Sequence, residues 1–574
     1  MKTMKDYKPY RTREIIDLKD MLYQSDKLYS RRNAFKLKGA NGLYKGISFR
    51  TYKTQVEYLG TSLLERNLAG STFAIMGQNC YEWCVAYFAA VCVGVVVPID
   101  KELKDDDIVN IINVSETSVI FVTDLFIEKI RSLSSRFSRD VLIINMHCKQ
   151  ASYSVLSLND LIAEGNVIYS SGNTCFKDMP IDPYEMKILL FTSGTTGMAK
   201  GVMLCHRNIC ANIKSVREVV KVYSSDQMIS LLPLHHTYEC TLGFLLPIYC
   251  GACISYCSGL RHLSQDIRDI HPSVIICVPL LVENVYKKIE KALPMPIGKM
   301  NFLVKKIALL KINNSLGGRL RLVITGAAAI DPQLVDSFNE LGFRALQGYG
   351  LTECSPLVTG NNDFFQKSDS VGRSIPDVDV KIDKPDYAGI GEVLVRGSNV
   401  MLGYFKNPEE TEKVFKNGWF CTGDLGSIDY KGFLHLTGRS KNVIVTKNGK
   451  NIYPEEVEYY LNNNPLISES IVSGAKFVGD DETYVEAHIL PNIDLIKQLL
   501  FVQIPTQEEI KSAIKDVIRD VNSKLPPYKH IKKFIIRDTE FDKTTTKKIK
   551  RVGNLPDDRE KDSVDVDNQP DHKE

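Results

Sequence analysis

The sequence predicts an α/β protein: a large N-terminal domain of parallel sheets layered with helices, with a β-rich subdomain, and a small α+β C-terminal domain. Three observations lead to this fold class. Short apolar strands alternate with helical patterns from about residue 70 to 350, which is typical of a largely parallel sheet covered by helices. From about 370 to 437 the strands become short, with frequent Gly and Asp turns. Finally, 574 residues exceed what one hydrophobic core normally holds.

Four apolar runs are the clearest candidate strands of the N-terminal domain, at residues 141–145, 187–191, 274–278 and 322–325. The last run leads through a Gly-Ala-Ala-Ala turn to Asp331-Pro332. An aspartate at the N-cap followed by a proline at the first helical position predicts a helix start there. In a sheet of this kind ligands bind beyond the carboxyl ends of the strands, so we expect the functional site at that edge.

Two apolar stretches, 84–99 and 228–260, need testing as membrane spans. The first is too short and contains a glycine and a proline, which favours a buried helix that runs into a buried strand. The second contains His235, His236 and Glu239, whose burial in a bilayer is costly, so we expect it inside the protein. The chain begins without a secretory signal, and its 14 cysteines are too dilute for a disulfide scaffold. We therefore expect a reduced, cytoplasmic protein, with peripheral contact at the inner membrane face left open.

The C-terminal domain is predicted from a change of pattern after Gly438. We expect a strand over 442–446, a helix that Pro454 opens, and strands near Ile471 and Val485. A second helix begins with a capping box, Thr-Gln-Glu-Glu at 506–509. Its apolar side chains give it one buried face; they are Ile510, Ile514, Val517, Ile518 and Val521. Residues 553–574 are polar and rich in Asp, which predicts a disordered acidic tail.

The net charge argues against a dedicated nucleic-acid binder. Lys and Arg number 72 against 69 Asp and Glu, so the formal charge is only +3. Proteins that bind DNA or RNA as their main task usually show a strong basic excess. We predict no nucleic-acid partner, and any anionic ligand must be bound by a small local site.

The most informative segment is Phe-Thr-Ser-Gly-Thr-Thr-Gly-Met-Ala-Lys-Gly at 191–201, directly after a predicted strand. Backbone N–H and hydroxyl groups of such a loop can wrap a polyphosphate, and Lys200 adds a cation. The close spacing of Gly194 and Gly197, and the glycine after the lysine, differ from the Walker A pattern. The alternative interpretation is a flexible surface turn. Two threonines and a lysine would be unusual for such a turn.

This loop resembles the phosphate-binding signature of the adenylate-forming (ANL) superfamily, which includes acyl-CoA synthetases, luciferases and the adenylation domains of peptide synthetases. Ala199 stands where the family has proline, a change that removes rigidity but no hydrogen-bond donor. The segments 347–353, 419–424 and 438–441 resemble further family motifs in the expected order. Each motif alone has a plain structural explanation, such as a turn or a solvated surface. Their shared order across nearly the whole chain favours the family.

The resemblance implies a role for each motif. Tyr349 would pack on adenine, Thr352 would meet the α-phosphate, and Glu353 would hold Mg²⁺, which prefers carboxylate and phosphate oxygens. Asp424 would accept hydrogen bonds from the ribose hydroxyls, which Arg439 would also reach. The implied catalytic residues are Lys548, Thr352, Glu353 and His236. The implied residues for ATP and CoA are Thr192, Ser193, Gly194, Thr195, Thr196, Gly197, Lys200, Gly326, Ala327, Ala328, Gly348, Tyr349, Gly350, Asp424, Arg439, Lys441 and Gly449.

The family also implies a division of the chain. Residues 1–438 would form the N-terminal adenylate-forming domain, which includes the β-rich subdomain at about 370–437. Residues 439–441 would be a hinge, and residues 442–552 a mobile C-terminal domain.

Residues 542–551 read Asp-Lys-Thr-Thr-Thr-Lys-Lys-Ile-Lys-Arg and have two interpretations. The family pattern makes Lys548 the mobile catalytic lysine, whose ammonium bridges the substrate carboxylate and the α-phosphate. Lys547 and Lys550 are close neighbours, so Lys548 is the best but not the only candidate. The alternative is a basic patch for nucleic acid, membrane phosphate or a targeting receptor.

Two other groupings resemble metal sites but lack the required pattern. Cys250 and Cys253 have CxxC spacing without a second ligand pair nearby, so we expect structural thiols. His235, His236 and Glu239 do not form a His-Glu-x-x-His helix. The family places a histidine here beside the incoming carboxylate, which assigns His236 that role. A satisfied buried histidine is the alternative.

The family reaction has two steps: a carboxylate attacks ATP to give an acyl-adenylate and pyrophosphate, and a thiol then forms a thioester and AMP. The segments 351–356 and 448–456 look most like the bacterial long-chain fatty acid–CoA ligases. ATP, Mg²⁺, coenzyme A and a fatty acid are therefore the expected ligands. Two alternatives stay open: an acyl-AMP ligase that loads an acyl carrier protein, and a non-catalytic nucleotide-binding regulator.

Overall fold

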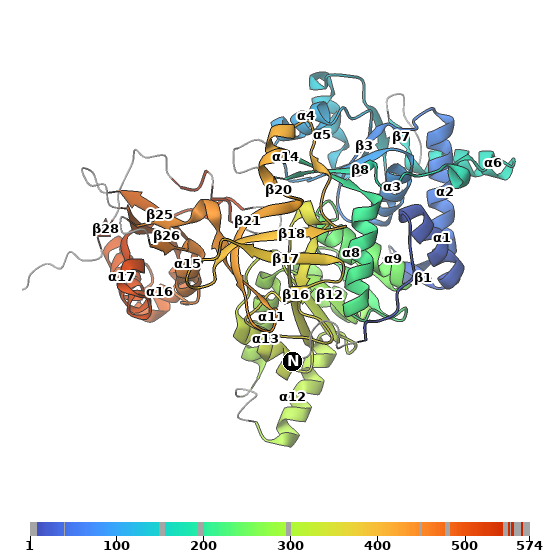
Figure 1. The fold of residues 1–574 in the computed structure, drawn as a ribbon. Helices are drawn as coiled ribbons and strands as arrows, with labels where there is room; N and C mark the ends of the chain where they lie inside the picture. The colour runs from blue at the N-terminus through green and yellow to red at the C-terminus, as the bar shows by residue number, and fades with distance from the viewer. Residues whose placement is uncertain are drawn as a thin grey trace, which may run out of the picture. The chain divides into compact units, whose positions relative to one another are not determined.

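The structure is a computed structural model that describes residues 8–39, 41–148, 155–192, 200–293, 295, 300–446, 450–476, 483–543, 549–551, 553–555 and 564–565. The chain divides into two compact units (Figure 1). Unit 1 consists of Met1–Val380, Val395–Phe420 and Asp429–Leu434, and unit 2 of Lys381–Leu394, Cys421–Ile428 and His435–Glu574. Most of the predicted acidic tail lies outside the described residues.

A nine-stranded sheet forms one half of unit 1, in the order β16-β15-β14-β13-β12-β10-β11-β1-β2. From β14 to β1 all neighbouring strands are parallel, whereas β2, β15 and β16 pair antiparallel at the edges. In chain order the strands are β1 (Asn33–Lys38), β2 (Tyr44–Ser48), β10 (Gln227–Ser230), β11 (Cys253–Tyr256), β12 (Val274–Cys277), β13 (Leu322–Thr325), β14 (Arg344–Gly350), β15 (Leu357–Gly360) and β16 (Arg373–Ser374). The predicted strands near 274 and 322 are confirmed as β12 and β13.

An eight-stranded sheet in the order β19-β9-β8-β4-β3-β5-β6-β7 forms the other half. The strands from β8 to β7 are parallel, and β9 and β19 continue the sheet antiparallel. They are β3 (Thr72–Met76), β4 (Val95–Ile99), β5 (Val119–Val122), β6 (Leu142–Asn145), β7 (Leu156–Ser157), β8 (Met186–Thr192), β9 (Lys200–Cys205) and β19 (Gly403–Tyr404). The predicted strands near 141 and 187 are thus confirmed as β6 and β8.

Helices cover these sheets, as an alternating pattern requires. They are α1 (Leu18–Tyr29), α2 (Phe49–Glu65), α3 (Tyr81–Val93), α4 (Asp105–Val114), α5 (Ile127–Leu133), α6 (Leu158–Ser170), α7 (Cys175–Asp178), α8 (His206–Val219), α9 (Leu246–Cys250), α10 (Leu263–Ile270), α11 (Pro279–Ala292), α12 (Phe302–Ser315), α13 (Pro332–Glu340) and α14 (Pro408–Val414). The side chain of Asp331 caps α13 by accepting from the backbone N–H of Gln333, as predicted. The buried helix α3 runs directly into the buried strand β4, which confirms the expectation for 84–99. Within the described residues, no helix has the length and apolar character needed to cross a membrane.

Five strands follow between residues 378 and 439, where the β-rich pattern occurs; they are not all short as expected, because β21 extends over 10 residues. The strands β17 (Val378–Asp383), β18 (Gly391–Gly397), β20 (Phe415–Lys416), β21 (Trp419–Ile428) and β22 (Leu434–Arg439) form one five-stranded sheet.

Unit 2 contains its own core, built on a four-stranded sheet of β25 (Ile467–Lys476), β26 (Thr483–Pro491), β27 (Ile531–Ile536) and β28 (Val564–Asp565). Its helices are α15 (Pro454–Asn462), α16 (Ile493–Leu500) and α17 (Gln507–Lys524). The predicted capping box at α17 is present, and the five predicted apolar side chains of α17 are buried. The expected strand over 442–446 is shorter: a 3₁₀ turn occupies Ser440–Asn442, and only Ile444–Val445 (β23) pairs, with Asn451–Ile452 (β24). The Asn442 amide donates to Glu455 at 2.6 Å, a side-chain bond that competes with strand pairing.

A buried carboxyl group lies in the core of unit 1, on a π-helical segment, Glu239–Leu245, that follows β10. The Ser230 hydroxyl donates to Glu239 at 2.6 Å. Gly243 leaves room for this carboxyl, because a Cβ there would lie 2.5 Å from the Glu239 Cδ. Burial raises the pKa of Glu239 to about 8, against the opposing effect of the hydrogen bonds that it accepts. Most of the stretch 228–260 is thus protein interior, as predicted, while its last residues, 258–260, are exposed.

This carboxyl should make the stability of unit 1 depend on pH. A folded-state pKa above the unfolded value favours folding at low pH, and the contribution is lost as pH rises from about 4.5 towards 8. We expect wild type to lose a few kcal/mol relative to Glu239→Gln between pH 5 and pH 8, since one pH unit is worth about 1.4 kcal/mol per proton. Urea unfolding followed by the fluorescence of Trp83 and Trp419, both in unit 1, measures the difference. The exposed Glu128→Gln is the control, and parallel curves for wild type and Glu239→Gln would contradict the expectation.

Candidate active site

The parallel strands of the nine-stranded sheet bring several predicted residues to one edge. His236 follows β10, Gly326 follows β13, and Gly348 and Gly350 end β14, with Glu353 just beyond. Because β10, β12, β13 and β14 are successive parallel neighbours, their carboxyl ends lie at the same edge. The fold therefore places these residues where such sheets bind ligands.

Small residues are required where β13 and β14 end. A Cβ at Gly326 would lie 3.2 Å from the Gly348 carbonyl oxygen, and a Cβ at Gly350 would lie 1.9 Å from the Pro356 carbonyl oxygen. After Gly326 the chain turns outward: Ala327 has a φ of 70°, and the side chains of Ala327 and Ala328 are exposed. Ala327 and Ala328, expected among the residues for ATP and CoA, thus present an open surface of small side chains after β13.

The ring of Tyr349, expected to face adenine, is buried, with 8% exposure. Its strand pairs with β15, with Tyr349 opposite Thr359. Buried neighbours on this strand pair fix the backbone from which Thr352 and Glu353 extend.

Two buried asparagines hold the turn that carries Thr352 and Glu353, a 3₁₀ turn over Thr352–Cys354. The Asn399 amide donates to the carbonyls of Cys354 and Leu357, each at 3.0 Å, and the Asn212 amide donates to Leu357 at 2.8 Å. Thr352 and Glu353 are themselves half-buried. These bonds hold the backbone of the turn, and so position the Glu353 carboxylate, but none of them is made to the carboxylate itself.

The phosphate loop is described only at its two ends. Thr192 ends β8 and Lys200 begins β9, and the two are opposite each other in the antiparallel pair. The loop between them, with Ser193, Gly194, Thr195, Thr196 and Gly197, lies outside the described residues.

Lys200 connects this loop to Glu353 through a tyrosine. Its ammonium lies 2.5 Å from a Glu410 oxygen and 5.1 Å from the centre of the Tyr404 ring. The Tyr404 hydroxyl donates to Glu353 at 3.1 Å. Tyr404 lies on β19, whose partner β9 begins at Lys200. Two motifs about 150 residues apart in sequence therefore share one polar network.

The charges of this network shift the pKa values of its members. Lys200, followed by Lys413, lowers the pKa of Glu410 to about 2, so that the carboxylate is charged at any physiological pH. Burial, followed by the Glu353 charge, raises the pKa of the Tyr404 hydroxyl, which therefore stays a donor.

His236 and its neighbour are neutral imidazoles at neutral pH, since burial lowers the pKa of each to about 4. The His236 Nδ1 accepts from the backbone N–H of Tyr238 at 3.3 Å. Asn79 braces the preceding segment: its amide donates to the Leu232 carbonyl at 2.6 Å, and its oxygen accepts from the Leu234 N–H at 3.0 Å. Because the His236 Nδ1 accepts the bond from Tyr238, Nε2 carries the proton of the neutral ring and is a donor, which suits a residue beside a substrate carboxylate.

Unit 2 pairs two of the residues expected at the ribose. A nitrogen of the Arg439 side chain lies 2.8 Å from the Asp424 carboxylate, which is 6% exposed. Gly423 takes a φ of 71°, and its N–H donates to Glu392 at 3.1 Å. The turn before Asp424 is therefore tightly fixed within this unit.

The remaining predicted residues of unit 2 are described in part. Lys441 lies in the 3₁₀ turn over Ser440–Asn442, while Gly449 and Lys548 lie outside the described residues. On either side of Lys548, Lys543 and Ile549 form an antiparallel bridge.

The cysteine and histidine groupings do not form a metal site in the described part of the chain. Cys250 is buried and Cys253 is partly exposed, both as free thiols. The Nε2 atom of His235 lies 3.6 Å from the Asp100 carboxylate. Glu353 fits Mg²⁺ better: one of its oxygens accepts from Tyr404, and carboxylates in such sites share the ion with substrate phosphates.

Sequence reasoning missed five residues that shape this region: Asn79, Asn212, Asn399, Tyr404 and Glu410. Each acts through contacts between segments far apart in the chain, as in the separation of 210 residues between Lys200 and Glu410. None belongs to a motif, so only the three-dimensional structure reveals them.

Comparison with known proteins gives matches over both units. The model of the AMP-binding enzyme family matches residues 25–405, and that of the AMP-binding enzyme C-terminal domain matches residues 441–554. The chain is 28% identical to long-chain-fatty-acid–CoA ligase 5 of Rattus norvegicus, over 89% of this chain and 83% of that protein. It is 26% identical to long-chain-fatty-acid–CoA ligase FadD15 of Mycobacterium tuberculosis, over 89% of this chain and 90% of that protein.

Solved structures share the fold at low sequence identity. ATP-bound MatB from Rhodopseudomonas palustris matches with a TM-score of 0.74 at 22% identity, over 93% of this chain and 97% of that one. The anthranilate CoA ligase AuaEII in complex with anthranoyl-AMP matches with a TM-score of 0.74 at 21% identity, over 96% and 97%. The two family models cover well over half of the sequence, and this confirms the resemblance drawn from its motifs. The chain belongs to the AMP-binding enzymes of the adenylate-forming superfamily.

Proposed function

We propose that this enzyme is an AMP-forming fatty acid–CoA ligase that acts on long-chain acids. Family membership and relatives named long-chain-fatty-acid–CoA ligases support the reaction class and the substrate. The observation that carries the proposal is the network from Lys200 through Tyr404 to Glu353. This network joins Lys200, the cation expected at the phosphates, to Glu353, the carboxylate expected at the metal.

In the first step the fatty acid carboxylate attacks the α-phosphorus of ATP, and pyrophosphate leaves. Lys200 and the loop at 193–197 would hold the phosphates, and Thr352 would donate to the α-phosphate. Lys548 would place its positive charge between the attacking carboxylate and the phosphorus, where negative charge grows in the transition state. His236, neutral and braced, would orient the carboxylate.

Mg²⁺ would be held by Glu353 together with the phosphates and would neutralise part of their charge. The chain's own contribution is the orientation of that carboxylate. The Tyr404 hydroxyl fixes one Glu353 oxygen, and Asn399 fixes the turn below it.

In the second step the CoA thiol attacks the acyl-adenylate, and AMP leaves. Asp424 and Arg439 would hold the ribose, and Gly449 would line the path of the pantetheine arm. Lys441, in the predicted hinge, would let the C-terminal domain, residues 442–552, withdraw Lys548 and bring the segment that carries Gly449 to the site between the two steps.

Product analysis distinguishes the proposed ligase from its alternatives. The protein is incubated with Mg²⁺, ATP, palmitate and either CoA or a phosphopantetheinylated acyl carrier protein. We expect palmitoyl-CoA, AMP and pyrophosphate. Label on the carrier protein without palmitoyl-CoA would contradict CoA as acceptor, and the absence of ATP–pyrophosphate exchange with every carboxylic acid tested would indicate a non-catalytic regulator.

Lys548→Gln should slow adenylate formation about 100-fold or more, because it removes a charge that stabilises the transition state. ATP–pyrophosphate exchange with palmitate measures this step. Thioester formation from supplied palmitoyl-AMP and CoA should change far less. Lys550→Gln is the matched control, and an equal loss in both variants would contradict the assignment to Lys548.

Tyr404→Phe should raise the Mg²⁺ concentration needed for half-maximal adenylation several-fold, because Glu353 loses the donor that orients it. The readout is pyrophosphate release as a function of free Mg²⁺ at saturating ATP. Tyr430→Phe, at an exposed tyrosine of the same unit, is the control. An unchanged Mg²⁺ dependence would show that the hydroxyl does not serve the metal site.

A further inference from the structure

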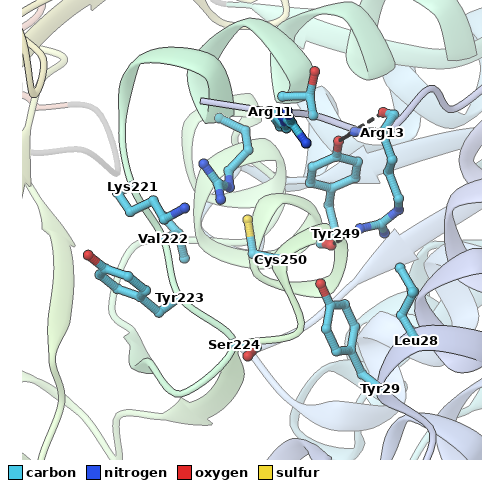
Figure 2. Close-up of a pocket in the computed structure, with 12 residues that line it drawn as sticks. Arg11, Arg13, Leu28, Tyr29, Lys221, Val222, Tyr223, Ser224, Tyr249 and Cys250 are labelled. Atoms are coloured by element: carbon cyan, nitrogen blue, oxygen red, sulfur yellow. Dashed lines mark hydrogen bonds between the residues drawn. The ribbon is translucent and has the colours of Figure 1, made fainter. Parts of the chain in front are cut away.

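A cationic pocket lies away from the candidate active site in unit 1. It has a volume of about 440 Å³, within the size range of small-molecule sites. The lining residues are Arg11, Thr12, Arg13, Leu28, Tyr29, Arg217, Lys221, Val222, Tyr223, Ser224, Tyr249 and Cys250. Figure 2 shows Lys221 and Tyr223 on one side, Arg13 and Tyr29 on the other, and Cys250 between them.

The pocket lies at the amino ends of the strands whose carboxyl ends form the candidate active site. Residues 221–224 precede β10, and α9, which carries Tyr249 and Cys250, precedes β11. The segment that carries His236 leaves β10 at its other end. The strand alone separates the two places by roughly 10 Å, at about 3.3 Å per residue. The pocket is therefore distinct from the edge of the sheet that carries His236 and Glu353.

Four cations and no carboxylate line this pocket, in a chain whose charges are nearly balanced. The four are Arg11, Arg13, Arg217 and Lys221. Among the described residues, none of them forms an ion pair with Asp or Glu, whereas the neighbouring Lys214 pairs with Glu14 at 2.5 Å. Unpaired like charges in one cavity repel each other unless an anion compensates them.

Arg13 is partly buried in this pocket. Its guanidinium donates to the Tyr249 carbonyl at 2.5 Å and to the Ser25 hydroxyl at 2.6 Å, and lies 4.0 Å from the centre of the Tyr249 ring. These partners are all neutral, and its Nε is buried without a hydrogen-bond partner in the described part of the chain. Burial lowers the pKa of Arg13, which reflects the cost of an uncompensated charge here.

Arg217, which also lines the pocket, has the same deficit. Its Nη1 is buried and lacks a hydrogen-bond partner among the described residues. Burial raises the pKa of the Cys250 thiol to about 12, and the charges of Arg217 and Arg13 oppose that rise. The charges of both guanidinium groups therefore affect the same side chain of the pocket lining, Cys250. Lys221 stands beside them, with its ammonium 4.8 Å from the Tyr10 ring centre and 5.7 Å from the Tyr223 ring centre.

From this arrangement we propose that the pocket binds the phosphate group of an organic phosphate ester. Several cations around one cavity suit a multiply charged anion with several acceptor oxygens, and guanidinium groups match phosphate geometry. The volume exceeds the needs of a phosphate alone, and the rings of Tyr29 and Tyr223 provide contact area for the attached organic group. Such a phosphate comes either from a soluble metabolite or from the headgroup of an anionic phospholipid.

The first arm of the test uses sn-glycerol 3-phosphate as a soluble probe. Isothermal titration calorimetry is carried out on the full chain without nucleotide, because AMP is itself an organic phosphate ester; any probe bound at the active site would still bind to the pocket variant. We expect saturable binding by wild type, at least tenfold weaker binding by Arg217→Gln/Lys221→Gln, and weaker binding at higher salt. Lys287→Gln/Lys288→Gln, an equal charge change at exposed residues of α11, should bind like wild type.

The second arm measures co-sedimentation with vesicles of phosphatidylglycerol or phosphatidylcholine. A preference of wild type for phosphatidylglycerol that the pocket variant lacks would assign the phosphate to a lipid. Binding of the soluble probe without this preference would assign it to a metabolite. If neither arm separates wild type from the pocket variant, the proposal is wrong. If the double variant unfolds, both arms are repeated with Arg11→Gln, a change at an exposed position. Adenylation activity should persist in every variant.

Discussion

The candidate active site of unit 1 depends on the hydrogen bond from Tyr404 to Glu353. Lys200 belongs to the eight-stranded sheet, and Glu353 follows a strand of the nine-stranded sheet. Tyr404 lies on the strand that pairs with the strand of Lys200, and it reaches Glu353 with its hydroxyl. The residues expected at the phosphates and at the metal lie in one region because this side chain connects the two sheets.

Much of the fold could be predicted from local pattern, because strand formation, capping and helix faces depend on residues close in sequence. Strands β6, β8, β12 and β13 and the caps of α13 and α17 are examples. The strand expected over 442–446 was wrong in its first half, because Asn442 bonds to Glu455, a residue of the following helix. Local pattern contains no information on such a partner.

The candidate site shows the same limit. The motifs predicted Glu353 and Lys200, and parallel topology explains why His236, Gly326 and Glu353 share an edge. Tyr404, Glu410 and Asn79 could not be predicted, because their importance depends on contacts that form only after the sheets assemble. The roles proposed for Thr195, Gly449 and Lys548 still depend on the family resemblance.

The ion pair between Lys200 and Glu410 has a consequence for ligand selection. The Glu410 carboxylate, charged at every physiological pH, occupies the ammonium that a phosphate would use. An incoming anion would therefore share the three N–H donors of this ammonium with Glu410, or compete with it for them. Weak monovalent anions such as chloride or acetate would fail in this competition, whereas a polyphosphate would succeed. The Glu410 carboxylate thus keeps the lysine ordered, and as a permanently charged neighbour it would favour highly charged ligands over weakly charged ones.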